Sequence, residues 1–201
     1  FANSATFLSW AFIKKKDEAS DLLLPLFPKG LYNLAVIYYR YKKYAASFGT
    51  AKDGLNFLYK NNLKDYRTEF RHFVAESWVK NRSYLNAVQE LDISIRQDPS
   101  FFNAARSFRR IADIYFDLNN YELSEDMYAL SEAMNKKVNK TDTTAAVLRG
   151  EALFWMKRFK ESTAHFEYGI EMMLKEHISP KASKNILPWA HLRLADSYLA
   201  I

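Results

Sequence analysis

Hydrophobic and small residues recur along the chain in one register that repeats four times. Each copy begins with a small residue, which is followed at offset 3 by an aromatic residue or leucine and at offset 9 by an aromatic residue. Small, bulky and small residues follow at offsets 12, 16 and 19. The copies are Ala35-Tyr38-Tyr44-Ser47-Ala51-Gly54, Ala75-Trp78-Tyr84-Ala87-Leu91-Ser94, Ala112-Tyr115-Tyr121-Ser124-Tyr128-Ser131 and Gly150-Leu153-Phe159-Ser162-Phe166-Gly169. Because spacings of three and four share one helix face, each copy predicts two amphipathic helices joined by a short polar turn.

The predicted turns between paired helices lie at residues 41–43, 80–83, 118–120 and 157–158. Small residues at fixed positions allow helix backbones to approach closely, and the aromatic residues can fill the space between one hairpin and the next. Neither helix of a pair could bury its apolar face alone. Stacked hairpins supply the missing surface, which is why units of this kind form arrays.

This register resembles that of the tetratricopeptide repeat (TPR) family. The family pattern is visible in the first copy as Leu34-Ala35, Tyr38 and Ser47, and in the second as Val74-Ala75, Trp78, Ala87, Leu91 and Asp98-Pro99. The first helix of a fifth copy is marked by Leu194-Ala195 and Tyr198. The resemblance implies an all-α, right-handed superhelical solenoid of antiparallel helix hairpins. It would run as one continuous domain over residues 28–201, with four repeats and the first helix of a fifth.

Several features depart from the family pattern. Successive copies are 40, 37, 38 and 45 residues apart, against about 34 in the family, so we expect longer second helices and a loop over residues 178–188. Without a closing proline, other second helices are expected to end near Asn61-Asn62 and Asn135. Residues 1–27 are expected to form a degenerate hairpin or cap. Phe1 indicates a processed or trimmed product, and the helix before Ile201 is either a cap or, as we slightly favour, continues into a larger protein.

Composition supports a folded helical protein and excludes several chemistries. Five glycines and five prolines among 201 residues are too few for a turn-rich β fold, and 49% hydrophobic residues are enough for a core. The absence of cysteine excludes disulfides, thiol nucleophiles and cysteine-ligated metals. The net charge of +6 is a mild basic excess. No apolar run reaches the roughly 20 residues of a membrane span. The compartment, cytoplasmic or periplasmic, is left open.

Candidate chemistry is sparse. The histidines do not have metal-binding spacing, and neither a glycine-rich phosphate loop nor a serine-hydrolase motif is present. An acidic group could suggest paired carboxylates or a cation site; it consists of Asp113, Asp117, Glu122, Glu125 and Asp126. Exposed carboxylates on helices more commonly pair with bases, as in the predicted pairs His72–Glu76 and Arg109–Asp113. We therefore predict no enzyme activity, no cofactor and no metal.

A concave groove is the predicted binding surface. In TPR-like proteins the first helices line that face, and the residue after the small one points into it. By this resemblance Glu76, Asp113, Glu151 and Asp196 would form an acidic ladder beside aromatic residues. Alternatively, the acids are solvated or paired by Arg109 and His72, and the aromatic residues pack between units. The residues predicted to bind a partner are Tyr32, Tyr39, Arg40, His72, Glu76, Lys80, Arg109, Asp113, Phe116, Asp117, Glu151, Phe154, Trp155 and Asp196.

These observations predict a non-catalytic interaction module or scaffold that binds a peptide or helical segment of another protein, with basic and apolar residues. An acidic groove disfavours nucleic acid. Two alternatives remain, because fold does not fix function: a ligand- or peptide-sensing regulatory domain of a larger signalling protein, and a structural subunit that self-associates. Basic residues in the turns could form a positive stripe for lipid or nucleic acid, although ordinary solubility explains them better.

Overall fold

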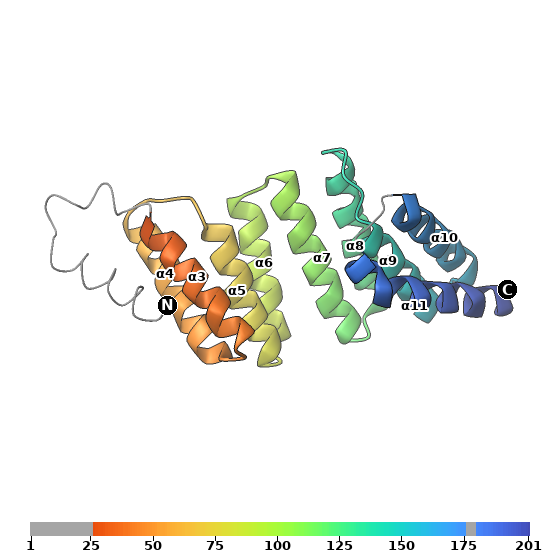
Figure 1. Ribbon diagram of the computed structural model, residues 1–201, viewed down its shortest axis with the longest axis horizontal. Helices are drawn as coiled ribbons and strands as arrows, with labels where there is room; N and C mark the ends of the chain where they lie inside the picture. The colour runs from red at the N-terminus through yellow and green to blue at the C-terminus, as the bar shows by residue number, and fades with distance from the viewer. Residues whose placement is uncertain (1–25, 176–179) are drawn as a thin grey trace, which may run out of the picture. The chain divides into compact units, whose positions relative to one another are not determined.

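The computed structural model describes residues 26–175 and 180–201, with side chains for 26–175 and 186–201. These residues contain nine α-helices and no strand, which confirms the all-α prediction (Figure 1). In chain order the helices are α3 (Leu26–Arg40), α4 (Tyr44–Lys60), α5 (Arg67–Lys80), α6 (Tyr84–Gln97), α7 (Phe101–Asp117), α8 (Tyr121–Lys136), α9 (Thr143–Trp155), α10 (Phe159–Lys175) and α11 (Pro180–Leu199). The cap predicted for residues 1–27 lies outside the described residues, apart from Leu26 and Phe27, which begin α3.

Contacts divide the chain into two compact units, residues 1–98 and 99–201. Within the first unit α3, α4, α5 and α6 pack in consecutive order, and α3 also touches α5. Within the second unit α7 to α11 pack consecutively, and α9 also touches α11. The helices therefore pair as α3–α4, α5–α6, α7–α8 and α9–α10, while α11 packs on α10 as a further first helix. The continuous solenoid over residues 28–201 stays a prediction.

Every hairpin turn has three residues and the same main-chain geometry, at positions 41–43, 81–83, 118–120 and 156–158. The middle residue has a positive φ between 58° and 61°, and the third donates its N–H over 2.9 Å to the carbonyl five residues earlier. This is the Schellman ending of a helix, where glycine is the favoured middle residue. Here the middle residues are Lys42, Arg82, Asn119 and Lys157. The turns predicted from the sequence are confirmed to within one residue.

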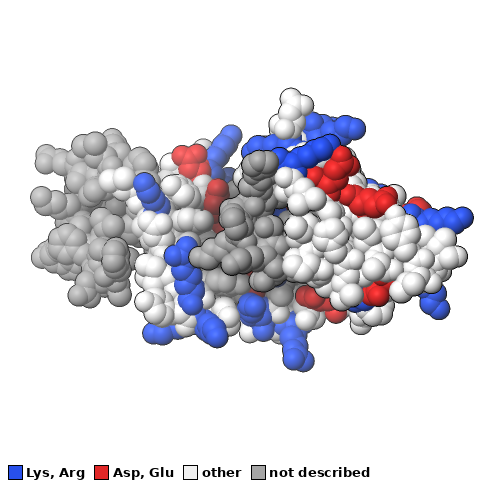
Figure 2. All heavy atoms as spheres, turned by 45° about the vertical axis from the view of Figure 1, so that its right-hand side comes forward, with Lys and Arg blue, Asp and Glu red and all other residues white. Residues whose placement is uncertain are grey.

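Basic side chains of the first unit gather at these turns. Arg40, Lys42, Lys43, Lys80 and Arg82 are all exposed. Figure 2 shows lysine and arginine side chains protruding at the lower edge of the view, and in Figure 1 the α3–α4 and α5–α6 turns lie at the lower ends of their helices. A use of this edge in binding lipid or nucleic acid stays a prediction.

The small residues of the register lie where paired helices cross. Ala35, Ala75, Ala112 and Gly150 are all buried. In three hairpins a serine of the second helix donates its hydroxyl to the main-chain carbonyl of this residue; these bonds are Ser47 to Ala35 (3.0 Å), Ser124 to Ala112 (3.0 Å) and Ser162 to Gly150 (2.8 Å). The buried hydroxyls are thereby satisfied, and the two helices are held at close range.

The loop predicted over residues 178–188 is wrong for its described part, because α11 is helical from Pro180 through Pro188. The N–H groups in the first turn of a helix have no acceptor within the helix, so a proline there costs no hydrogen bond. Pro180 can therefore begin a helix. Pro188 removes a hydrogen bond inside the helix. The helix continues because Ala190, two residues later, is fully buried in a core with Phe166 and Ile170.

Replacing Gly54 with alanine should lower the free energy of unfolding by about 1–3 kcal/mol, the usual cost of overpacking. The added methyl carbon would lie 2.4 Å from the ring of Phe70, which is fully buried. The control is Gly49→Ala in the same helix, where nothing lies within 4 Å and alanine should stabilise by about 0.5–1 kcal/mol. Urea unfolding followed by circular dichroism measures both; equal effects would contradict this packing.

Candidate functional site

The acidic residues predicted to line a groove have partners inside the protein. Glu76 accepts a hydrogen bond from the hydroxyl of Tyr39 at 3.4 Å. Asp113 accepts one from the hydroxyl of Tyr128 at 2.7 Å and a longer one from Arg110 at 3.5 Å. These carboxylates therefore hold helices together, and the alternative that the acids are paired describes them better than a ladder of free charges.

Arg109 pairs with Asp142 at 3.1 Å, and not with Asp113 as predicted. Asp142 also caps α9 by accepting a hydrogen bond from the main-chain N–H of Ala145 at 3.0 Å. Arg109 therefore ties α7 to the start of α9. Burial raises the pKa of Asp113, an effect that the Tyr128 hydroxyl and the nearby arginines partly offset.

The predicted aromatic residues of the first unit serve mainly in packing. The ring of Tyr32 lies 5.5 Å from that of Phe73 and 5.6 Å from that of Tyr66, and the ring of Tyr39 lies 6.0 Å from Phe73. His72 is buried, whereas Arg40 and Lys80 are exposed at the helix ends. The structure thus brings Tyr32 and Tyr39 together around Phe73 and leaves the two basic residues at the surface.

The second unit presents a group of aromatic side chains at the ends of α7 and α9, which we call the α9 aromatic cluster: Phe116, Tyr121, Phe154 and Trp155. Trp155 stacks on Tyr121 with ring centroids 5.9 Å apart and planes 14° from parallel. Phe116 and Phe154 meet these two rings edge to face, at 5.3 Å and 6.0 Å. Trp155 is 47% exposed, while the other three rings are half-buried.

Two charged residues contact Trp155, one directly through a hydrogen bond and one through its guanidinium. Its indole Nε1 donates a hydrogen bond to Glu151 Oε1 at 2.8 Å, and the other oxygen of Glu151 pairs with Arg193 Nε at 3.1 Å. The Arg193 guanidinium lies 5.1 Å from the centre of the Phe154 ring and 5.6 Å from that of Trp155. Arg193 also bonds Asp196 at 3.3 Å. Burial raises the pKa of Glu151, against the lowering effects of Trp155 and Arg193.

Sequence reasoning found Phe116, Phe154 and Trp155 but missed Tyr121 and Arg193. Tyr121 occupies the offset-9 position of the register, which was interpreted as a residue that fills the space between hairpins. Arg193 lies two residues before the small residue of its copy, as Arg110 does, and both pair with an acid three residues later. That repeated arginine–acid spacing is the signal that could have identified Arg193.

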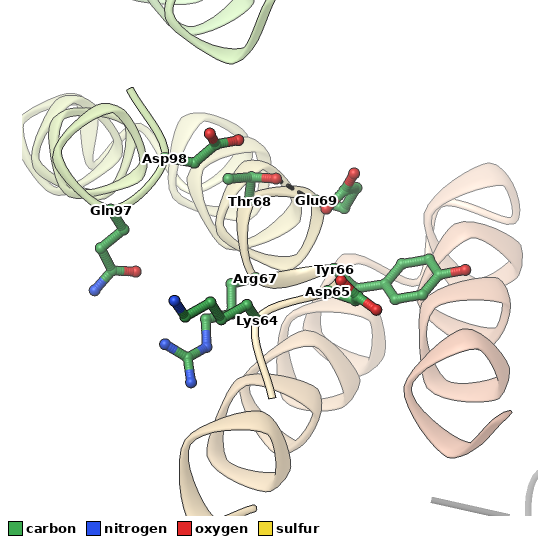
Figure 3. Close-up of a pocket in the computed structure, with 8 residues that line it drawn as sticks. All are labelled: Lys64, Asp65, Tyr66, Arg67, Thr68, Glu69, Gln97 and Asp98. Atoms are coloured by element: carbon green, nitrogen blue, oxygen red, sulfur yellow. Dashed lines mark hydrogen bonds between the residues drawn. The ribbon is translucent and has the colours of Figure 1, made fainter. Parts of the chain in front are cut away.

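None of the hollows given for the described residues is lined by a residue of this cluster. One of about 750 Å³ in the first unit is shown in Figure 3 and is lined by Lys64, Asp65, Tyr66, Arg67, Thr68, Glu69, Gln97 and Asp98. In that view Lys64 and Arg67 reach to one side and Tyr66 to the other. Two hollows of the second unit measure about 420 and 200 Å³, and Arg109 lines the smaller. Of the predicted residues, Arg109 alone lines any of these three hollows.

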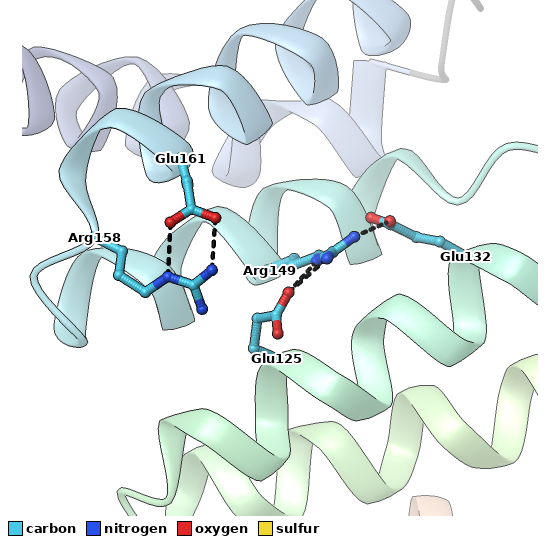
Figure 4. A network of polar contacts seen from close by, with 5 residues as sticks. All are labelled: Glu125, Glu132, Arg149, Arg158 and Glu161. Carbon is cyan, nitrogen blue, oxygen red and sulfur yellow. Dashed lines mark hydrogen bonds and ion pairs between the residues drawn. The ribbon is translucent and has the colours of Figure 1, made fainter.

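A network of ion pairs joins α8 to α9 (Figure 4). Arg149 donates from Nε to Glu125 at 2.6 Å and from Nη1 to Glu132 at 3.0 Å. Burial raises the pKa of Glu132, and Arg149 partly offsets that effect. Arg158 and Glu161 pair separately at the exposed start of α10. Because each carboxylate of the network faces an arginine, the network is structural in character.

The described residues include no group of three or more histidine, aspartate and glutamate side chains placed to hold a metal ion. None of the helices in residues 26–175 and 180–201 is both long and apolar enough to cross a membrane.

Comparison with known proteins identifies the fold. No protein-family model matches this sequence, and no curated protein matches it. Among solved structures, BtubC (BKLC) from P. vanneervenii has a TM-score of 0.79 at 11% identity over 99% of this chain and 80% of that one. RapI in its apo form has a TM-score of 0.75 at 13% identity over 99% of this chain and 56% of that one.

A tetratricopeptide repeat protein from Parabacteroides merdae is also similar, with a TM-score of 0.65 at 16% identity over 99% of this chain and 66% of that one. Similarity at these identities concerns the fold and does not carry an activity with it. The paired helices, the buried small residues at their crossings and these matches agree. The chain has the TPR-like helical-repeat fold that its sequence predicted.

Proposed function

We propose that this chain is a non-catalytic protein-interaction module, and that the α9 aromatic cluster anchors a peptide or helical segment of a partner protein. The observation that carries the proposal is that Trp155 is both exposed and held in one orientation. Its side chain is 47% exposed, yet its orientation is set by Tyr121, Glu151 and Arg193. A large aromatic surface is thus presented to solvent in one fixed position.

A fixed and exposed aromatic side chain suits binding for two reasons. Tryptophan, tyrosine and arginine are the residue types that most often dominate the energy of protein interfaces. A side chain that is already ordered loses little conformational entropy when a partner covers it, so more of the buried area contributes to affinity. Trp155 meets both conditions.

The surroundings of the cluster indicate the chemistry of the partner. Because the indole N–H is bonded to Glu151, Trp155 offers a partner its apolar ring surface. Asp117 and Glu122 follow directly after Phe116 and Tyr121 in the sequence, and both are exposed. A segment with an apolar side chain for Trp155 and a lysine or arginine for these carboxylates would complement the surface.

The structure also decides which substitutions can test the proposal. Charge reversal at Asp113 would leave the buried Tyr128 hydroxyl without its acceptor, and charge reversal at Glu151 would place a cation beside Arg193, so lost binding could reflect damaged folding. Asp117 is exposed enough to change without that ambiguity. Replacing Trp155 also removes the hydrogen bond to the buried Glu151, so circular dichroism must show that this variant is folded.

Trp155→Ala should weaken binding of a peptide selected on the wild-type chain from a random display library by at least about tenfold, which is about 1.4 kcal/mol. The control is Tyr168→Ala on α10, because Tyr168 is also 47% exposed but lies outside the cluster. Fluorescence anisotropy with labelled peptides measures both. Peptides that bind the Trp155 variant as tightly as the wild type would contradict the proposal, as would a selection that enriches none.

Glu151→Gln should change how stability depends on pH. Burial holds the folded-state pKa of Glu151 above its ordinary value of 4.5, so the folded chain binds this proton more tightly than the unfolded chain. As pH rises from 4.5 through the raised pKa, the wild type should therefore lose stability relative to the glutamine variant. Urea unfolding of both chains at pH 4 and pH 7 measures this. If the wild type and the glutamine variant differed in stability by the same amount at pH 4 and at pH 7, the assignment of a raised pKa to Glu151 would be contradicted.

A further inference from the structure

The α3–α4 and α5–α6 turns bring five exposed basic side chains to one end of the first unit. We call this surface the basic edge; it consists of Arg40, Lys42, Lys43, Lys80 and Arg82. Both turns lie at the same end of their hairpins in Figure 1. The Lys80 ammonium lies 5.6 Å from the centre of the Tyr44 ring, so the end of α5 touches the start of α4. The cations of the two turns therefore belong to one surface.

The charges of the basic edge are not balanced by carboxylates. No aspartate or glutamate occurs at positions 26–52 or 77–89, which include both turns. Glu76 lies just before the second of these segments and accepts a hydrogen bond from the Tyr39 hydroxyl at 3.4 Å. None of the five cations forms an ion pair with a carboxylate of the described residues. A surface that serves solubility alone has charges of both signs interspersed, and the basic edge has one sign.

The middle residue of each turn is basic at a position where the backbone favours glycine. Lys42 and Arg82 have φ values of 59° and 58°. Glycine is the usual residue at this position of a Schellman ending, because a Cβ is disfavoured there. A cation near the end of a helix does interact favourably with the helix dipole, but Arg40 and Lys80 already supply one in the last turns of α3 and α5. Helix termination alone therefore does not explain the cations of the turns.

Two large apolar or aromatic side chains project from the same surface. Tyr41 is 75% exposed and Leu85 is 71% exposed. Among the described residues of the first unit these are the two most exposed large hydrophobic side chains, and Leu26 follows at 53%. Tyr41 lies between two cations in the sequence, and Leu85 lies in the first turn of α6, three residues after Arg82. The greatest apolar exposure of the unit thus coincides with its unbalanced positive charge.

We propose that the basic edge binds the surface of a membrane that contains anionic phospholipids. The lysine and arginine side chains contact the lipid phosphates, and each of them adds to the attraction. Leu85 enters the boundary of the acyl chains. Tyr41 stays at the level of the headgroups, where an aromatic ring with a polar tip is favoured. Only side chains of the two turns reach the lipid, and the helices stay outside it.

Two observations favour a lipid surface over nucleic acid or an acidic peptide. Leu85 has no aromatic face on which a base could stack, and base stacking is the main apolar contact that proteins make with single strands. None of the three hollows described above is lined by a residue of the basic edge, so the edge offers no recess of that kind for a peptide side chain. Projecting side chains flanked by cations suit a flat and fluid partner that can accept them.

This inference is independent of peptide binding at Trp155. The basic edge belongs to the first unit and shares no residue with the α9 aromatic cluster, which belongs to the second. A failure of either proposal therefore leaves the other standing.

Flotation of the full chain with phospholipid vesicles tests the proposal. The wild type should bind vesicles of phosphatidylcholine with about 30% phosphatidylserine and should not bind vesicles of phosphatidylcholine alone. The combined substitutions Lys42→Gln, Lys43→Gln and Arg82→Gln should weaken binding at least about tenfold, because each lost cation reduces the attraction to the anionic surface. Circular dichroism confirms that each variant is folded.

The matched control removes the same number of charges from the opposite end of the same hairpin. Lys29 lies near the start of α3, Lys60 ends α4, and Lys64 follows α4; all three are exposed. The combined substitutions Lys29→Gln, Lys60→Gln and Lys64→Gln should leave binding within about twofold of the wild type, because these lysines face away from the proposed contact.

A leucine pair tests whether an apolar side chain enters the lipid. Leu85→Ser should weaken binding to the anionic vesicles by about threefold or more, because the loss of buried apolar area lowers interfacial affinity. Leu26→Ser, at an exposed leucine at the start of α3, should have no effect. Equal binding of these two variants would contradict the proposed contact.

Other results of the vesicle experiment would overturn the proposal outright. One is a wild type that floats with neither kind of vesicle or equally with both; another is a triple variant of the basic edge that binds as tightly as the matched control. Mobility shifts with single-stranded DNA, double-stranded DNA and polyglutamate are measured in parallel. A shift that requires Lys42, Lys43 and Arg82, from a chain that leaves anionic vesicles unbound, would assign the edge to nucleic acid or to an acidic protein segment.

Discussion

The close crossing of two helices is the constraint on which each hairpin depends. Three of the four hairpins bring a serine hydroxyl within 3.0 Å of a carbonyl oxygen on the facing helix, and this is geometrically accessible only when both residues at the crossing are small. Larger residues there would separate the backbones and leave the buried hydroxyl without an acceptor. The close crossing of the helices also determines where the aromatic residues pack. Rings pack against the positions that lack a side chain, as the Phe166 ring does 3.2 Å from where a Cβ of Gly150 would lie.

This constraint also explains the candidate site. Glu151 follows Gly150 directly, so the close crossing carries its carboxylate into a place where it is only 4% exposed. A carboxylate that leaves water needs a hydrogen bond or an opposite charge. The indole N–H of Trp155, one helical turn later, donates the hydrogen bond, and the guanidinium of Arg193 supplies the charge. The orientation of Trp155 is thus a consequence of how a buried charge is satisfied. Its exposure follows from its place at the end of α9, beside the turn.

The sequence predicted the hairpins and several residues of the site, but not the ion pairs that orient them, because different ranges of interaction set the hairpins and the ion pairs. The register of small and bulky residues is local, and side-chain volume suffices to predict that Ala112 and Ser124 meet. The partner of Glu151 is Arg193, 42 residues later, and that of Arg109 is Asp142, so these pairs depend on how one hairpin stacks on the next. The turns have lysine, arginine or asparagine where glycine would have been the signal. The sequence did not predict the helix through Pro188, because proline locally disfavours a helix interior. The helix forms there because the burial of Ala190 offsets that local cost.

Within the second unit, the two sides of α11 have different surroundings. Arg193 and Leu192 are neighbours in sequence but point to different sides of the helix: Arg193 meets Glu151 and the ring of Trp155, while Leu192 is 61% exposed. Because the position of Arg193 is set by α11, the packing of α11 on its own unit also determines the contacts that orient Trp155. The candidate site therefore depends on the stacking of α11 as well as on α9.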